Sequence, residues 1–148
     1  MENVKSASDN TPEQGVGGKT DPASVLAVVQ KEYEKRCEEL GKDHPDTLKT
    51  LHELALVHYY LKDHEKAHEL LKRTYLLQCT VLGNQHQETL RTLSYLALTY
   101  HALGYYQKSL RLFENAYEFH GRTLKDDHPM MVRLRQYILE AKEKLAEQ

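Results

Sequence analysis

The spacing of apolar residues between positions 45 and 81 predicts two amphipathic helices separated by a short turn. In the first stretch the apolar side chains recur three, four or seven residues apart, which places them on one helical face. They are Leu48, Leu51, Leu54, Ala55 and Leu61. The second stretch keeps the same spacing with Ala67, Leu70, Leu71, Thr74 and Tyr75. Two such helices in succession form a hairpin whose apolar stripes face each other.

This pattern recurs with a period of 42 residues. Residues 40–81 and 82–123 align without a gap at 14 identical positions. The register extends in both directions, so two full repeats are flanked by half repeats at 22–39 and 124–148, the second acting as a cap helix. A single hairpin cannot cover its own apolar stripe, so stacked neighbours must bury it. The pattern therefore predicts an all-α domain of about six helices over residues 21–148.

The helix ends carry recognisable signals. A capping residue followed by proline marks the helix starts near residues 45 and 129. Histidine recurs at the same place in each repeat, where we expect it to hydrogen-bond the turn between repeats; the residues are His44, His86 and His128. The hairpin turns fall near residues 62–63 and 104–105. Only the second contains a glycine, Gly104, which adopts a left-handed conformation at little cost, so the first turn should be more strained.

The first twenty residues differ from the rest of the chain. They are polar and rich in Gly, Ser and Asn, so they cannot bury enough apolar surface to offset the entropy of ordering. We predict that residues 1–20 form a disordered N-terminal tail. Its segment Gly15–Thr20 matches only the second half of a phosphate-binding loop and follows no strand-like run, so we predict no nucleotide site there.

Composition narrows the class of protein further. The 148 residues carry a formal net charge of −2, whereas a nucleic-acid partner requires a concentrated basic face. The apolar runs are far shorter than the roughly 20 residues of a membrane span, and no apolar stretch follows Met1. We therefore expect a cytoplasmic protein with no nucleic-acid or membrane partner. Cys37 and Cys79 are expected to be reduced packing residues.

The repeat resembles a known family. The second unit has Leu93-x-x-Leu96-Ala97-x-x-Tyr100, followed by small and aromatic residues at Tyr106, Ser109, Phe113 and Ala116. This motif resembles the tetratricopeptide repeat (TPR), and the 42-residue period with a Leu-Gly-x-x-His-Pro opening is most similar to the kinesin light chain and nephrocystin type. The resemblance implies an α-solenoid of antiparallel helix pairs in a right-handed superhelix. It also implies a non-catalytic adaptor or scaffold that holds a partner peptide or helix in a concave groove.

In the resembled family that groove is lined by the first helix of each pair. The residues expected there are Lys49, His52, Leu56, Tyr59, Arg91, Ser94, Tyr95, Leu98, His101, Arg133, Gln136 and Tyr137. Lys49, Arg91 and Arg133 are spaced by 42 residues and form a basic ladder, which would suit an acidic partner. The same three residues are also explained as solvated charges at helix starts.

No catalytic motif or cofactor site is recognisable, so we predict that the protein is not an enzyme. His64 and His68 have the i, i+4 spacing of metal ligands, but no third ligand completes a site and we predict none. Two alternatives to partner binding stay open. The apolar ends of the array, around Val25–Val29 and Tyr137–Leu139, would allow copies to associate into a scaffold. The chain would otherwise be a targeting or regulatory fragment of a larger enzyme or motor adaptor.

Overall fold

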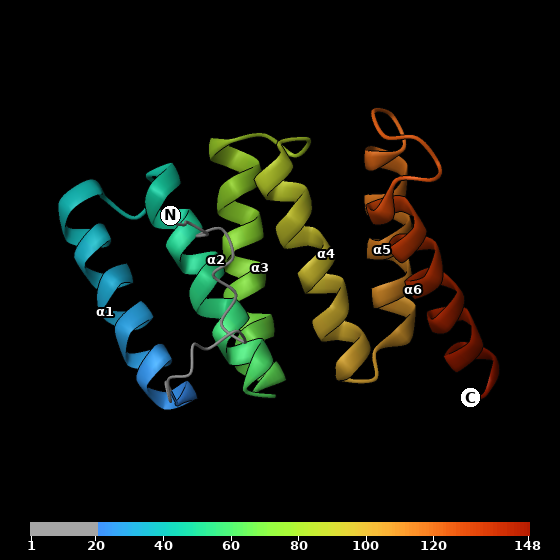
Figure 1. Cartoon of the computed structure of the whole chain (residues 1–148), viewed down its shortest axis with the longest axis horizontal. Coiled ribbons are helices and arrows are strands. Elements are labelled where there is room, and N and C mark those ends of the chain that lie inside the picture. The colour runs from blue at the N-terminus through green and yellow to red at the C-terminus, as the bar shows by residue number, and fades with distance from the viewer. Residues whose placement is uncertain (1–20) are drawn as a thin grey trace, which may run out of the picture.

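Six α-helices and no strand are present in the computed structural model, which describes residues 21–148 (Figure 1). The predicted disordered tail, residues 1–20, lies outside the described residues. The helices follow one another along the molecule in chain order, each packed on its neighbours in the chain, and α2 also contacts α4. They are α1 (Pro22–Leu40), α2 (Pro45–Tyr60), α3 (His64–Val81), α4 (Gln87–Ala102), α5 (Tyr106–His120) and α6 (Pro129–Ala146).

The helix starts confirm the 42-residue period. The first helices of the pairs, α2, α4 and α6, begin at residues 45, 87 and 129, and the second helices, α1, α3 and α5, begin at residues 22, 64 and 106. Each start lies 42 residues after its equivalent in the preceding unit. The chain as described therefore begins on a second helix and ends on a first helix.

Histidine caps all three first helices in the same way. The Nδ1 atom of His44 accepts a hydrogen bond from the backbone N–H of Asp46 at 3.0 Å. His86 and His128 accept from the residue two positions later at 3.0 and 3.1 Å. Each imidazole thereby satisfies one of the backbone donors that a helix start leaves unpaired. We expected these histidines to hydrogen-bond the turn between repeats, but their side chains bond the first turn of the helix that follows it.

The two hairpin turns differ in their backbone strain. Lys62, between α2 and α3, has φ of 70°, and it is the only non-glycine residue with positive φ between residues 21 and 148. The equivalent residue between α4 and α5 is Gly104, with φ of 88°. A side chain makes this backbone region unfavourable by roughly 1–2 kcal/mol. The expectation that the first turn is more strained is therefore confirmed.

The core lies inside the two complete hairpins and between them. Ala55 and Leu71 are fully buried between α2 and α3, together with Leu51, Leu54, Leu70 and Leu96. Ala97 and Phe113 occupy the equivalent place between α4 and α5, in a second cluster with Leu90, Leu93, Ala116 and Leu134. The small alanines let the helices approach closely. None of the six described helices is long and apolar enough to cross a membrane.

Candidate partner-binding surface

Four tyrosines form an aromatic row across the first helices of the pairs: Tyr59, Tyr60, Tyr95 and Tyr137. The rings of Tyr59 and Tyr60 on α2 meet edge to face, with centroids 5.4 Å apart. Tyr59 meets Tyr95 of α4 in the same way at 6.0 Å. The hydroxyl groups of Tyr60 and Tyr95 lie 3.3 Å apart, within hydrogen-bonding distance. Edge-to-face geometry is favourable for aromatic pairs, so the row joins α2 to α4.

Tyr137 extends the row to α6. Burial raises the pKa of the Tyr59 hydroxyl above its ordinary value of 10, and the neighbouring Tyr137 and Tyr95 raise it further. The pKa of Tyr137 is raised chiefly by burial as well. Its ring stacks on Phe113 of α5, with centroids 5.0 Å apart and planes 25° apart. Tyr137 is thus packed against the core of the second hairpin.

His52 does not lie on the face where the sequence analysis placed it. Its side chain is only 1% exposed, and Nδ1 lies 2.9 Å from the Thr92 hydroxyl of α4. Its ring packs edge to face against Tyr95 at 5.7 Å. The resemblance implied that position 52 lines the groove, but Thr92 and Tyr95 of α4 cover this side of α2. We therefore exclude His52 from the surface and regard it as a positioning residue beneath Tyr95.

The basic ladder lies on the same three helices as the row. Lys49, Arg91 and Arg133 are exposed near the N-terminal ends of α2, α4 and α6. Burial raises the pKa of Tyr137, and the positive charge of Arg133 opposes that rise. The guanidinium of Arg91 comes no nearer than 3.8 Å to the carboxylate of Glu88, and an exposed pair of this kind is weak. Arg91 is therefore only weakly paired within the chain.

The other predicted residues differ in accessibility. Leu56 and Leu98 are half-buried, and Leu98 packs against the core between α4 and α5. Ser94 donates its hydroxyl proton to the carbonyl of Leu90 at 3.2 Å. Gln136 is exposed, and its amide nitrogen donates to the Glu140 carboxylate at 3.5 Å.

At the C-terminal end of α4, His101 packs its ring against Tyr106 at 5.0 Å. Burial lowers the pKa of His101, and the nearby Glu140 of α6 opposes that shift. His101 is half-buried.

Sequence reasoning missed Tyr60, which is 61% exposed and is the outermost member of the row. The repeat gives no signal for it, because the equivalent position holds Ala102. Conversely, the first repeat lacks a tyrosine that the later repeats have, because Glu53 stands at the position of Tyr95 and Tyr137. The adjacent pair of tyrosines at the end of α2 was the available clue, since two consecutive rings cannot both face the core.

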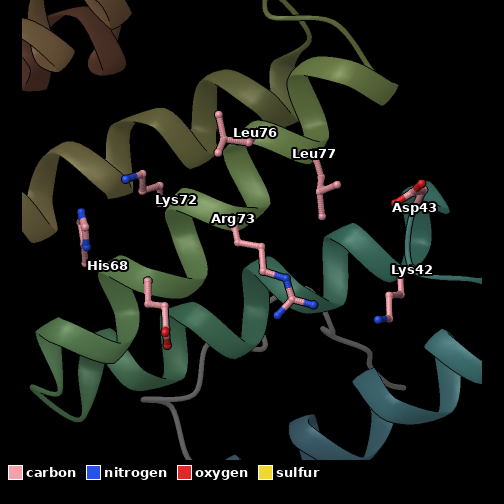
Figure 2. Close-up of a pocket in the computed structure, with 8 residues that line it drawn as sticks. Lys42, Asp43, His68, Lys72, Arg73, Leu76 and Leu77 are labelled. Atoms are coloured by element: carbon pink, nitrogen blue, oxygen red, sulfur yellow. The ribbon is translucent and has the colours of Figure 1, made fainter.

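A shallow hollow of about 700 Å³ lies elsewhere, beside α3 (Figure 2). The α3 helix contributes most of its lining, and the loop between α1 and α2 contributes Lys42 and Asp43. Arg73, in the wall, donates to the Tyr33 hydroxyl at 3.0 Å, and Glu69 accepts from Lys66 at 2.9 Å. The charges here are mixed and partly paired internally. None of the twelve predicted residues lines this hollow.

The histidines with metal-like spacing have aromatic neighbours. His64 packs against Tyr59 at 5.3 Å, and His68 packs against Tyr100 at 4.5 Å. Within residues 21–148 no group of three or more His, Cys, Asp or Glu side chains is arranged to hold a metal ion. Cys37 and Cys79 are free thiols, each half-buried.

Successive helical hairpins stacked in register define an α-solenoid. Two family models, both of the tetratricopeptide repeat, match residues 30–78 and 89–129, together more than half of the chain. The chain belongs to the tetratricopeptide repeat family. Repeats of this family generally mediate contacts between proteins.

Solved structures support the same fold. The crystal structure of the putative kinesin light chain nearly identical TPR-like repeats of Podosopora anserina matches with a TM-score of 0.68 and 23% sequence identity. A second crystal structure, of a single-residue variant of the same repeats, matches with a TM-score of 0.70 and the same identity. In both cases the match covers 86% of this chain but only 60% of the other. No curated protein sequence matches the chain.

Proposed function

We propose that this chain is a non-catalytic interaction module that binds an acidic peptide or helix of a partner protein. The partner lies across α2, α4 and α6, on the aromatic row and the basic ladder. The single observation that carries this proposal is the row itself, since four tyrosines from three helices come together, three of them half-buried and Tyr60 61% exposed. Tyrosine provides large contact area at little entropic cost, and it is enriched at the centres of protein interfaces.

The basic ladder supports an acidic partner. Lys49, Arg91 and Arg133 recur on successive first helices, and the weak contact of Arg91 with Glu88 leaves its charge largely uncompensated. Cations beside an aromatic patch attract a carboxylate while the rings pack against apolar side chains. The remaining members of the proposed surface are Leu56, Tyr59, Ser94, Tyr95, Leu98, His101, Gln136 and Tyr137, with Tyr60 added and His52 removed.

The absence of catalysis is part of the same proposal. Besides phenols and cations, this surface carries the hydroxyl of Ser94 and the imidazole of His101. The Ser94 hydroxyl donates to the Leu90 carbonyl and the His101 ring packs against Tyr106, so these contacts do not pair a nucleophile with a general base. The buried His52 has its pKa lowered to about 3 by burial and by the charge of Arg91, so it stays neutral near pH 7. Partner binding requires only contact area and charge on this surface, whereas catalysis would also require a paired nucleophile and base.

The test begins with identification of a partner by affinity capture, followed by tiling of the partner sequence as synthetic peptides. Binding of the active peptide is then measured for Tyr95→Ala and Arg91→Glu. We expect each variant to bind about tenfold more weakly or worse, as for central interface residues. Arg91→Glu should also remove part of the salt dependence of binding.

Two control variants match these changes away from the surface. Arg111 is exposed on α5 and provides the same charge reversal, Arg111→Glu. Tyr105, 56% exposed at the turn before α5, provides the same truncation, Tyr105→Ala. Both controls should bind the peptide as the unmodified chain does. Equal losses in controls and test variants would show that the partner binds elsewhere.

A further inference from the structure

The hollow beside α3 has one end at which two cationic side chains meet. The hollow measures about 700 Å³ and is lined by α3 and by the loop between α1 and α2. Figure 2 shows the Arg73 guanidinium of α3 and the Lys42 ammonium of the loop directed toward the same space, and the Leu77 side chain is directed at it as well. This end of the hollow therefore combines two positive charges with an apolar wall.

Arg73 is held in place by a different helix. Its guanidinium donates to the hydroxyl of Tyr33 in α1 at 3.0 Å. This contact orients a long side chain that would otherwise sample many rotamers. No other hydrogen bond joins the Arg73 side chain to a described residue. A guanidinium has several N–H donors in a fixed plane, so the remaining donors are positioned in advance for a ligand.

Neither cation has an anionic partner within the described chain. No ion pair joins Lys42 or Arg73 to a described carboxylate. Of the two carboxylates in the lining, Glu69 is bound by Lys66 at 2.9 Å, and Figure 2 shows Asp43 directed away from the Lys42 ammonium. Like charges that share one space repel each other, so an anion that neutralises both should bind favourably.

Two further lysines make the surroundings of the hollow more positive. Burial lowers the pKa of His68, which lines the hollow, and the charges of Lys72 and Lys108 lower it further. The residue equivalent to Lys72 in the second repeat is Glu114, so this charge is a property of the first repeat. A cluster of one sign of charge attracts ligands of the opposite sign.

The second repeat lacks the pair of cations. The tyrosine that holds Arg73 recurs as Tyr75, but the asparagines Asn84 and Asn115 replace Lys42 and Arg73. The second hairpin nevertheless packs around its own core cluster. Stacking of the repeats therefore does not require the two cations, which are available for a ligand.

We propose that this end of the hollow binds a phosphate monoester, with the phosphoryl group between Lys42 and Arg73 and the organic group against Leu77. Such a group carries about −1.5 to −2 charges at pH 7, so it neutralises both cations, whereas a carboxylate neutralises one. The planar guanidinium also matches the phosphate oxygens in bidentate geometry. Repeats of this family generally mediate contacts between proteins, so we assign the phosphoryl group to a phosphorylated side chain of a partner.

This site is separate from the surface on α2, α4 and α6. No residue of the aromatic row or the basic ladder lines the hollow. Phosphoryl binding therefore does not rest on the proposed function, and the chain could hold one partner on each surface. The two sites can be tested separately, because each has its own cations.

The first test titrates the full, isotope-labelled chain with phenyl phosphate near neutral pH and follows the backbone amide signals by NMR. We expect saturable shifts around Arg73, Leu77 and the loop of residues 41–44. Phenyl sulfate has the same shape but a single negative charge, so it should bind about tenfold more weakly or worse. Inorganic phosphate lacks the organic group and should bind more weakly than phenyl phosphate.

Four variants test the residues assigned to the site. Arg73→Gln and Lys42→Gln each remove one charge and should weaken phenyl phosphate binding about tenfold. Tyr33→Phe keeps both charges but releases the Arg73 side chain, so it should weaken binding several-fold. Leu77→Ala should weaken the binding of phenyl phosphate and leave that of inorganic phosphate unchanged.

The controls remove charges elsewhere. Arg111→Gln on α5 and Lys125→Gln before α6 each alter an exposed cation outside the hollow and should bind phenyl phosphate as the unmodified chain does. Arg91→Glu should also leave phenyl phosphate binding unchanged, so failure of this site is distinguishable from failure of the peptide surface. Circular dichroism should show the same helical content for every variant.

Four results would overturn the proposal. Equal affinities for phenyl phosphate and phenyl sulfate would show that the site does not require a doubly charged group. Shifts centred on Lys49, Arg91 and Arg133 would place the anion on the basic ladder. Equal losses in Arg73→Gln and Arg111→Gln would indicate a general attraction to positive charge. The absence of saturable shifts in the unmodified chain would exclude phosphoryl binding in this hollow.

Discussion

His52 of α2 and Thr92 of α4 join successive repeats through a buried hydrogen bond of 2.9 Å between Nδ1 and the hydroxyl oxygen. The Thr92 hydroxyl donates its own proton to the carbonyl of Glu88 at 3.1 Å. The imidazole proton therefore resides on Nδ1 and is donated to Thr92, which leaves Nε2 as a buried acceptor. This contact positions the ring against which Tyr95 packs.

Acidification should destabilise the protein partly through His52. Its pKa is about 3 in the folded protein and 6.5 in its unperturbed state. Between these values the unfolded chain binds a proton that the folded chain does not, so the free energy of unfolding falls as pH drops below 6.5. The slope from this one residue is up to about 1.4 kcal/mol per pH unit.

The variant His52→Gln isolates that contribution. Glutamine keeps a donor for Thr92 but does not titrate, so the variant should lose less stability between about pH 7 and pH 5. Part of the slope should remain, because burial also lowers the pKa values of His68, His101 and His120. Urea unfolding at both pH values measures the difference, and identical slopes for the two proteins would contradict the role assigned to His52.

The capping role of His86 predicts different effects for two substitutions. Asparagine is a favourable capping residue whose side-chain oxygen accepts a hydrogen bond from the start of the helix, as His86 Nδ1 does from Glu88. His86→Asn should therefore leave the melting temperature nearly unchanged, whereas His86→Ala should cost about 1 kcal/mol. Thermal unfolding followed by circular dichroism distinguishes the two. A loss of several degrees in the asparagine variant would mean that the imidazole does more than cap the helix.

The two hairpin turns should respond in opposite directions to reciprocal changes. Lys62→Gly removes a side chain from a residue with φ of 70° and should stabilise the protein slightly, by about 0.5 kcal/mol after the added entropy of the unfolded chain. Gly104→Lys places a side chain at φ of 88° and should destabilise by about 1–2 kcal/mol. Open space surrounds Gly104, so the loss reflects backbone strain alone. Chemical denaturation gives both values, and changes of the same sign would refute this account.

Phe113 should affect partner binding without touching the partner. It is fully buried in α5 and stacks on Tyr137. Phe113→Leu should cost about 1–2 kcal/mol of stability and weaken binding of the peptide by loosening Tyr137. Leu110→Val, at another buried position of α5, is the control and should lower stability with little effect on binding. If both variants bound the peptide equally well, Tyr137 would not be part of the binding surface.

Local sequence determined the helices, their boundaries and the repeat. These features depend on a few neighbouring residues or on one hairpin. They are the 42-residue period, the apolar spacing of Leu51, Ala55 and Leu71, the recurring histidine caps and the absence of glycine from the first turn. They therefore predicted six helices in the correct register. The basic ladder was also readable, because equivalent positions in successive repeats carry the same charge.

Only the tertiary structure decided what covers each helix. Whether position 52 is open or buried depends on α4, which lies forty residues further along the chain and supplies Thr92. The aromatic row likewise joins Tyr60 to Tyr95, and the repeat does not relate those positions. A helical wheel gives the direction of a side chain from its own helix, whereas burial depends on the neighbouring helix. The sequence of one repeat therefore could not predict the burial of His52. Stacking between repeats determines which polar groups lose their contact with water.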